Sequence, residues 1–376
     1  MNNILITGGA GFIGSNLTQK LVKKGFKVTI LDNLSKQIHG KNQNSTLYSS
    51  IKDIATFIKG DVCNKSDWQK ALRNQDAVIH LAAETGTGQS MYEISRYNEV
   101  NILGTTHLLD ILANENHTIK KMIIASSRSI YGEGKYLCKN DGVVYPNQRQ
   151  DIDMANGKFN LVCFKCNEPL QLLATDEHSK IHPSSIYGIT KQQQEQMILL
   201  VGKSLNIPAV ALRYQNVYGP GQSLNNPYTG ILSIFSTRLL NENDIDIYED
   251  GQESRDFVFI DDVVNATILA LEKKQANNQI FNVGSGVATS VSEVANLLKS
   301  LYNSDVKISV SGKYRFGDIR HNYADLSKIE NVLGFSPKFD FLSGITSFVN
   351  WVKTQKVMED KYEISIQELE SKGLIK

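Results

Sequence analysis

Short apolar runs alternate with helical patterns over the first 213 residues. Six runs have the length of buried strands and are separated by polar or glycine-containing turns. They lie near residues 4–7, 27–31, 55–59, 77–81, 121–126 and 208–213. Between the first two runs, Leu17, Leu21 and Val22 fall on one face of a helical segment. Alternating strands and helices predict an α/β fold with a doubly wound parallel sheet.

A glycine-rich turn follows the first predicted strand and precedes the first predicted helix. Glycines in this context let the backbone approach a pyrophosphate, whose charge then faces the free N–H groups of the helix N-terminus. The order of strand, turn and helix therefore predicts a Rossmann-type sheet and a dinucleotide site. A glycine turn of another α/β protein is the alternative. The predicted contacts from this turn are Gly8, Gly11, Phe12, Ile13 and Gly14.

The second predicted strand ends at Asp32, about twenty residues beyond the glycines, as in dinucleotide-binding folds. A carboxylate at this place suits the two ribose hydroxyls of NAD and repels the extra phosphate of NADP. NAD is therefore the predicted cofactor.

Tyr187 and Lys191 are four residues apart on a predicted helix, so they share one face. A lysine beside a tyrosine favours the phenolate, which can act as a base near neutral pH. Alone, such a pair is more often an exposed polar face. Ser126 and Ser127, after the fifth predicted strand, add a hydroxyl at the carboxyl edge of the sheet.

Together these motifs resemble the extended short-chain dehydrogenase/reductases of the nucleotide-sugar epimerase and dehydratase family. The resemblance runs from Asn3 to about Trp351. It also rests on Gly60-Asp61-Val62, His80-Leu81-Ala82-Ala83, Asn98 to Thr105, Arg213 to Gly221 and Arg255 to Val258.

The resemblance implies a domain organisation. Residues 1–214 are expected to bind NAD, and 215–354 to form a smaller mixed α/β substrate domain. A helix near 261–274 is expected to pack back on the first domain. Residues about 133–183 contain an insertion relative to the common family plan, and 355–376 form a charged helical tail without a motif.

The resemblance also implies roles for individual residues. Tyr187 takes the proton of a sugar hydroxyl, Lys191 assists it, and Ser127 hydrogen-bonds the reacting oxygen; these three are the predicted catalytic residues. Tyr187 and Lys191 are also expected to contact the cofactor, and the remaining implied cofactor contacts are Asn33, Asp61, Val62, Leu81, Ala82, Ala83, Asn101 and Tyr214. The implied substrate contacts, which include arginines suited to a diphosphate, are Glu84, Ser127, Arg128, Asn216, Gln222, Arg255 and Arg315.

The residues after Ser127 favour one reaction over another. In the 4,6-dehydratases of the family, Asp and Glu at these positions supply the acid and base for water elimination; here they are Arg128 and Ser129. An epimerase needs only the tyrosine, lysine, serine and NAD. The insertion and residues 211–224 resemble dTDP-L-rhamnose 4-epimerases, which implies conversion of dTDP-L-rhamnose to dTDP-6-deoxy-L-talose for surface polysaccharides. Other functions remain open. The chain could be a different NDP-sugar epimerase, namely a UDP-hexose or UDP-glucuronate 4-epimerase or a 3-epimerase, or an NAD(P)H-dependent NDP-keto-sugar reductase.

Three of the four cysteines lie in the insertion. Cys163 and Cys166 have C-x-x-C spacing, and Cys138 lies upstream with Asp141 three residues after it. These residues predict a structural zinc site with Asp141 as the fourth ligand. Reduced cysteines without a metal are the alternative.

The composition does not indicate a function, but it argues against some kinds of partner and location. The net charge is +1, so no general attraction to nucleic acid or membrane follows. No 18-residue apolar run is present, and the first apolar stretch reads as a strand rather than a signal peptide. We expect a cytoplasmic enzyme, and a homodimer formed through the helix of Tyr187 and Lys191 and the helix near residues 90–113.

Overall fold

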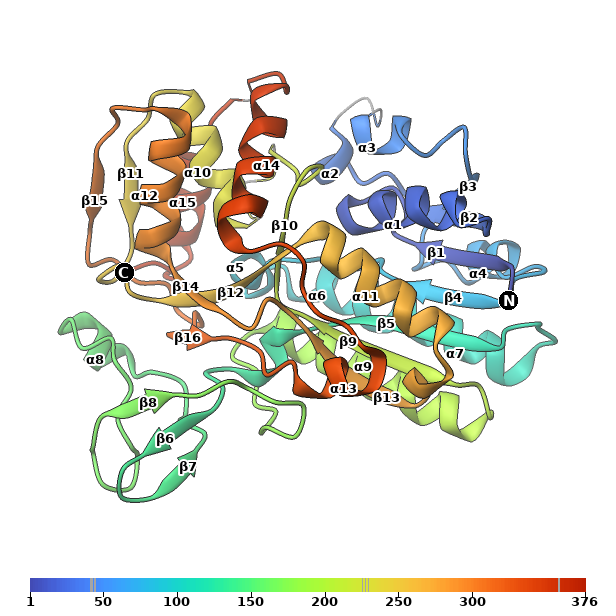
Figure 1. Ribbon diagram of the computed structural model, residues 1–376, viewed down its shortest axis with the longest axis horizontal. Coiled ribbons are helices and arrows are strands. Elements are labelled where there is room, and N and C mark those ends of the chain that lie inside the picture. Colours follow the sequence, from blue (N-terminus) through green and yellow to red (C-terminus); the bar gives the residue numbers. More distant parts are fainter. Residues whose placement is uncertain (41–42, 44, 225, 227, 229, 358) are drawn as a thin grey trace.

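The computed structural model describes residues 1–376 except 41–42, 44, 225, 227, 229 and 358. Its centre is a seven-stranded parallel sheet of order β13-β9-β5-β4-β1-β2-β3 (Figure 1). The strands are β1 (Asn3–Thr7), β2 (Lys27–Asp32), β3 (Thr56–Lys59), β4 (Ala77–His80), β5 (Lys121–Ser127), β9 (Ala209–Tyr214) and β13 (Gln279–Val283). The first six confirm the predicted strands; the sequence does not predict β13.

Helices cover both faces of this sheet. Successive strand residues point to opposite faces, so Ile4 and Ile6 pack in one apolar core and Leu5 in the other. The first core includes α1 (Phe12–Lys23) and α11 (Ile260–Glu272), which contact each other. The second includes α4 (Lys65–Ala71), α7 (Gly104–Asn114) and α9 (Ile186–Ser204). The predicted doubly wound α/β fold is confirmed.

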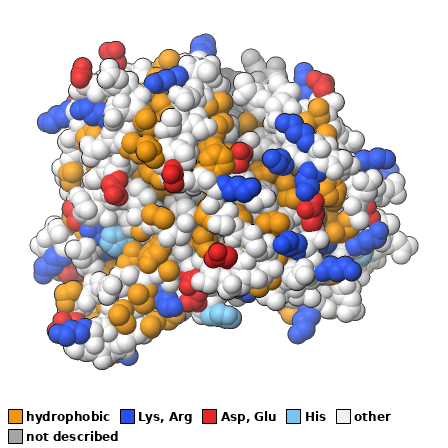
Figure 2. All heavy atoms as spheres, viewed as in Figure 1, with side chains coloured by type: hydrophobic (Ala, Val, Ile, Leu, Met, Phe, Trp, Pro, Cys, Tyr) orange, Lys and Arg blue, Asp and Glu red, His pale blue; other side chains and the backbone are white. Residues whose placement is uncertain are grey.

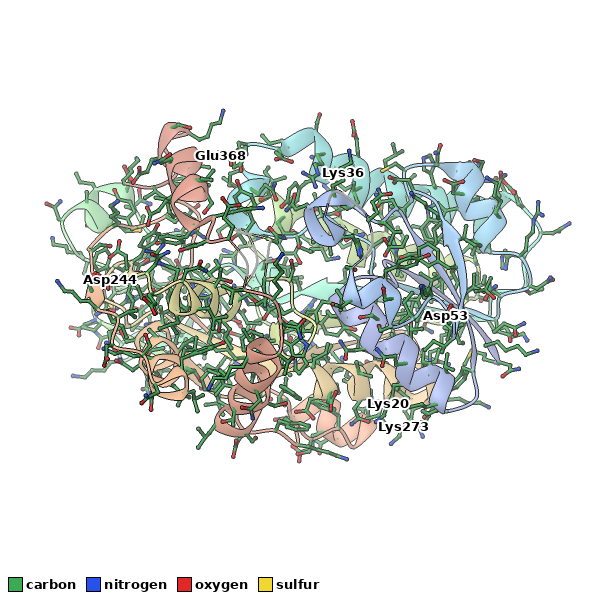
Figure 3. The ribbon with its side chains drawn as sticks, turned by 90° about the horizontal axis from the view of Figure 1, so that it is seen from above. Lys20, Lys36, Asp53, Asp244, Lys273 and Glu368 are labelled. Atoms are coloured by element: carbon green, nitrogen blue, oxygen red, sulfur yellow. The ribbon has the colours of Figure 1, made fainter. Side chains whose placement is uncertain are left out.

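The remaining strands after β9 form smaller sheets. One contains β10 (Asn216–Tyr218), β12 (Ser254–Phe259), β14 (Ala288–Ser290) and β16 (His321–Asn322), and another β11 (Ile245–Ile247) and β15 (Ile308–Val310). The helices here are α10 (Ile231–Leu240), α12 (Val291–Tyr302), α13 (Ser327–Leu333), α14 (Phe341–Lys353) and α15 (Tyr362–Ser371). Seen from above, Asp244 and Asp53 lie toward opposite ends of the long axis (Figure 3). Asp244 precedes β11 and Asp53 precedes β3, so these two strands are far apart. The boundary at residue 214 stays a prediction.

The insertion forms a small separate sheet below the rest of the molecule in Figure 1. It consists of β6 (Tyr136–Cys138), β7 (Gly142–Val144) and β8 (Leu170–Leu172), with α8 (Asp151–Ala155) beside it.

Short helical turns connect these elements. They are α2 (Lys36–His39), α3 (Thr46–Ser49), α5 (Thr87–Ser90), α6 (Ile94–Tyr97), η1 (Asn98–Leu103), η2 (Arg128–Tyr131) and η3 (Lys274–Ala276). Within the described part of the chain, no helix has the length and apolar character needed to cross a bilayer. Basic and acidic side chains are interspersed on the face in Figure 2, in keeping with the small net charge.

Candidate active site

Two adjoining cavities lie at the carboxyl edge of the large sheet. The first, of about 340 Å³, is lined by the glycine turn, and the second, of about 370 Å³, by β12, α10 and α15. Tyr187 and Thr85 line both, so Tyr187 stands where the cavities meet. Each volume is in the range of small-molecule sites.

The glycine turn has the backbone that a pyrophosphate requires. Gly8 has φ +66°, and a Cβ at Gly14 would lie 2.3 Å from the Gly8 carbonyl oxygen. The turn places Gly11 at the N-cap of α1, where no side chain caps the helix. The free N–H groups of the first turn, at Phe12 and Ile13, therefore face a cavity suited to an anion. The residues present fit a dinucleotide.

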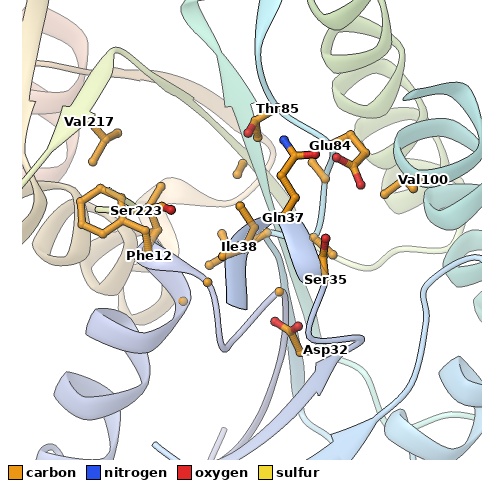
Figure 4. A pocket seen from close by; sticks show the side chains of 18 of the residues that line it. Phe12, Asp32, Ser35, Gln37, Ile38, Glu84, Thr85, Val100, Val217 and Ser223 are labelled. Atoms are coloured by element: carbon orange, nitrogen blue, oxygen red, sulfur yellow. The ribbon is translucent and has the colours of Figure 1, made fainter. Parts of the chain in front are cut away.

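Asp32 ends β2 at one side of this cavity (Figure 4). Its carboxylate accepts hydrogen bonds from the backbone N–H groups of Ala10 (3.0 Å) and Leu34 (2.8 Å). Burial raises the pKa of Asp32, although these bonds and His39 at 3.9 Å act against the rise. A carboxylate has about four acceptor sites, so capacity remains for ribose hydroxyls.

We expect this chain to bind NAD more tightly than NADP, because the added phosphate would face the Asp32 carboxylate. The double change Asp32→Ser with Asn33→Arg removes the repulsion and supplies a cation, and it should shift the preference toward NADP. Isothermal titration calorimetry with both cofactors measures the shift. Equal affinities in the unaltered protein would contradict the assignment.

Most of the other predicted cofactor contacts line the first cavity. These are Asn33, Val62, Leu81, Ala82, Ala83, Lys191 and Tyr214. Asp61 and Asn101 are not among the described lining residues. Asp61 instead accepts from Asn33 Nδ2 at 2.9 Å, and Asn101 bonds the backbone of Glu84 and, at 2.9 Å, Thr190 Oγ1. Asp61 and Asn101 therefore hydrogen-bond residues that line the cavity, Asn33 and Glu84.

Tyr187 and Ser127 come together although 60 residues separate them in the chain. Burial raises the pKa of Tyr187, while a hydrogen bond with Ser127 and the charge of Arg128 act against that rise. Ser127 Oγ also accepts from the Ser129 N–H at 3.1 Å, which fixes the orientation of the serine. The hydroxyl groups of Tyr187 and Ser127 can therefore both hydrogen-bond one oxygen atom of a substrate.

Lys191 lies one turn after Tyr187 on α9, as predicted. Its Nζ donates to Gln194 Oε1 at 2.7 Å, and burial lowers the pKa of Lys191 to about 7, with Glu195 acting to raise it. Ser127 and Arg128 act to lower the pKa of Tyr187, and the expected lowering by Lys191 stays a prediction. A buried lysine that is only partly charged at pH 7 contributes less positive potential.

Arginines gather in the second cavity. Arg128, Arg255 and Arg315 all line it, together with Asn216, which accepts from Arg128 Nε at 2.8 Å. Burial, and then the charge of Arg255, lower the pKa of Arg128 to about 9. Arg315 Nε is buried and has no hydrogen-bond partner among the described residues. Three guanidinium groups and an unused donor suit a diphosphate.

Three predicted substrate residues lie outside the described lining of the second cavity, and one of them, Ser127, lines the first cavity with Tyr187. Glu84 and Gln222 line the first cavity and are not among the described residues that line the second. Glu84 pairs with Arg96 at 2.8 Å, and Gln222 is buried against the backbone of Val217. Their positions are those of cofactor-cavity residues.

The last helix, α15, also contributes to the site, which the sequence does not predict. Tyr362, Ser365, Ile366 and Leu369 of α15 line the second cavity. Arg315 pairs with Ile375 in an isolated β-bridge, which holds the tail against the molecule. The spacing of these four residues places them on one helical face, and that pattern was the available signal. The helix α15 is therefore part of a cavity wall.

The four predicted zinc ligands also come together, within the insertion and away from both cavities. Their ligand atoms all lie within 4.8 Å of one another; the residues are Cys138, Asp141, Cys163 and Cys166.

Comparison with known proteins agrees with this geometry. The model of the NAD dependent epimerase/dehydratase family matches residues 4–149 and 165–284. A dTDP-L-rhamnose 4-epimerase from Burkholderia thailandensis is 36% identical over 353 residues, 93% of this chain and 94% of the relative. A structure of UDP-glucose 4-epimerase from Thermotoga maritima with UDP-glucose has a TM-score of 0.75 and 29% identity over 93% of this chain and 98% of that one.

A second structure extends the comparison to a complex with a cofactor. UDP-glucuronic acid 4-epimerase from Bacillus cereus, in complex with UDP-glucuronic acid and NAD, has a TM-score of 0.75. It is 27% identical over 93% of this chain and 99% of that one. The chain is therefore an enzyme of the NAD dependent epimerase/dehydratase family, as its motifs predict.

Proposed function

We propose that this enzyme is an NAD-dependent 4-epimerase of nucleoside diphosphate sugars. We further propose that it interconverts dTDP-L-rhamnose and dTDP-6-deoxy-L-talose. The observation that carries the proposal is the position of Tyr187 at the junction of a dinucleotide cavity and an arginine-lined cavity. A hydroxyl group there can reach a sugar carbon that lies next to a cofactor.

The residues of the junction suit proton transfer at a secondary alcohol. Tyr187 takes the proton of the C4 hydroxyl, and Ser127 donates to the same oxygen as it becomes a ketone. Burial raises the pKa of Tyr187, and Ser127 and Arg128 act against that rise, in the direction that this step needs. The cavity lined by the glycine turn and Asp32 would hold NAD, which would supply the reversible hydride transfer at C4 that inversion requires. Tyr187 then gives the proton back.

The two positions that follow Ser127 carry no carboxylic acid for the elimination of water. η2, which begins directly after Ser127, starts with Arg128 and Ser129 instead of two carboxylic acids. The next acidic residue in the chain, Glu133, is buried against Arg149 and is not among the described residues of either cavity. These positions support epimerisation over 4,6-dehydration.

Support for the sugar comes from the Burkholderia thailandensis relative, which is a dTDP-L-rhamnose 4-epimerase. Support for a nucleoside diphosphate comes from the guanidinium groups of Arg128, Arg255 and Arg315.

The test is a panel of dTDP- and UDP-sugars incubated with the enzyme and a catalytic amount of NAD. We expect NMR to show dTDP-6-deoxy-L-talose from dTDP-L-rhamnose, without net change in absorbance of the reduced cofactor. Turnover of UDP-sugars alone would disprove the proposed substrate. A stoichiometric demand for NADPH would instead identify a keto-sugar reductase.

We also propose a homodimer through α9 and its neighbouring helices. Leu200 on α9 is 71% exposed, and Leu103 on the adjoining η1 is 43% exposed. Burial of such side chains against a second copy would be favourable. Light scattering should give the mass of two chains for the unaltered protein, and of one for Leu200→Glu. A monomeric unaltered protein would disprove the dimer.

A further inference from the structure

The sheet of the insertion has a small apolar core, and Met154 and Phe159 pack separately with Tyr314. Its buried cluster contains Tyr136, Cys138, Val144 and Cys163, with three partly buried leucines around it. Small units with such cores usually need a disulfide or a metal. The family model omits residues 150–164, so this region departs from the common family plan.

Two tight turns bring four ligand groups to one point. In the first, Cys138 pairs with Gly142 across the β6–β7 hairpin, and the φ of +71° at Gly142 permits a turn that holds Asp141. In the second, the Asn167 N–H donates to the Cys163 carbonyl at 2.8 Å, and Asn167 has φ +59°. This second turn holds the C-x-x-C pair.

The separations match a tetrahedral metal site. Cys138 Sγ lies 3.4 Å from Cys166 Sγ, and Asp141 Oδ2 lies 3.5 Å from Cys138 Sγ and 3.2 Å from Cys163 Sγ. Zinc–sulfur bonds of about 2.3 Å in a tetrahedron place two sulfurs about 3.8 Å apart. The sulfur–sulfur distance of 3.4 Å is somewhat shorter than that value, and the two oxygen–sulfur distances lie near the roughly 3.5 Å that a zinc–oxygen bond of about 2.0 Å would give.

Other uses of these groups fit less well. A disulfide joins two cysteines and leaves the third thiol facing the Asp141 carboxylate. A tetrahedral site uses all four groups, and three thiolates favour zinc among the common divalent metals. We propose that Cys138, Asp141, Cys163 and Cys166 bind one structural zinc ion that fastens the insertion.

The insertion is bonded to the wall of the second cavity. Arg149 Nη1 donates to Glu249 at 2.7 Å and Nη2 to the Asp318 carbonyl at 2.9 Å; both partners line that cavity. Asn160 Oδ1 accepts from Arg320 at 2.9 and 3.0 Å. The zinc ion therefore acts on this wall from a distance, by holding the segments that carry Arg149 and Asn160.

The test begins with metal analysis of the full-length protein. We expect about one zinc per chain, consistent with one four-ligand site, and its loss in Cys163→Ser. The matched control is Cys63→Ser, since Cys63 lies outside the cluster and bonds the Glu99 carbonyl; this variant should keep its zinc. Equal zinc in both variants, or a disulfide within the cluster by mass spectrometry, would overturn the proposal.

A second measurement does not depend on the folding of variants. Chelator-treated protein titrated with Co²⁺ should develop a thiolate-to-cobalt charge-transfer band, which zinc then abolishes, and zinc should raise its Tm. Absence of the band and of any Tm shift would also overturn the site. Both readouts are independent of the proposed epimerase activity. If that activity holds, zinc removal should raise KM for the sugar nucleotide more than it lowers kcat.

Discussion

Tyr187→Phe is expected to abolish turnover while NAD and sugar nucleotide still bind. The change removes one oxygen atom that acts only when the hydroxyl proton is transferred, so the loss falls on kcat. Loss of general-base catalysis alone is worth about 100- to 10,000-fold. Steady-state kinetics and calorimetry on the same preparation measure the two effects separately.

Tyr302→Phe is the matched control, because it removes the same atom from a residue of α12 that is not among those that line the cavities. Its turnover should equal that of the unaltered enzyme. If Tyr187→Phe kept more than about a tenth of the activity, outside the general-base range, another residue would have to be the base.

Glu195→Ala is expected to cause the largest loss of stability. Glu195 and Arg213 are both buried, and the guanidinium donates to both carboxylate oxygens, at 2.6 and 3.0 Å. Ser126 Oγ adds a bond of 2.6 Å to the same carboxylate. Removal of one partner leaves a buried charge unpaired, which costs about 3–5 kcal/mol in the free energy of unfolding.

Urea denaturation measures this loss against Glu272→Ala. Glu272 pairs with Lys24 at 2.9 Å at the surface, and such exposed pairs contribute only about 0–1 kcal/mol. A similar small loss for both variants would show that the Glu195–Arg213 pair adds little.

The sequence predicts six strands because their apolar runs report burial on both faces of a parallel sheet. The seventh strand, β13, escapes this pattern because the polar residue Asn282 interrupts its short apolar run. Asn282 is fully buried, where it accepts from the Tyr131 hydroxyl and donates to the Thr175 carbonyl. These partners come from distant parts of the chain, so a local pattern cannot reveal them.

Some features of the candidate site can be predicted from local sequence, and others depend on packing between distant segments. The glycine turn, Asp32 and the Tyr187–Lys191 pair are local motifs, and the structure places them around the first cavity as the sequence predicts. The cavity to which Glu84 belongs, and the pKa of Lys191, depend on packing between elements far apart in the chain. So does the approach of α15 to the second cavity.

The position of β13 has a consequence for how the chain is made. β13 pairs with β9, and α11 covers the face of the sheet beside α1. During synthesis, the first 214 residues therefore emerge with the backbone groups of β9 unpaired along one edge. The apolar side chains that α11 later covers are then in water. Unpaired edges and uncovered apolar faces promote aggregation. A nascent chain of this length should need chaperone protection until residue 283 has left the ribosome.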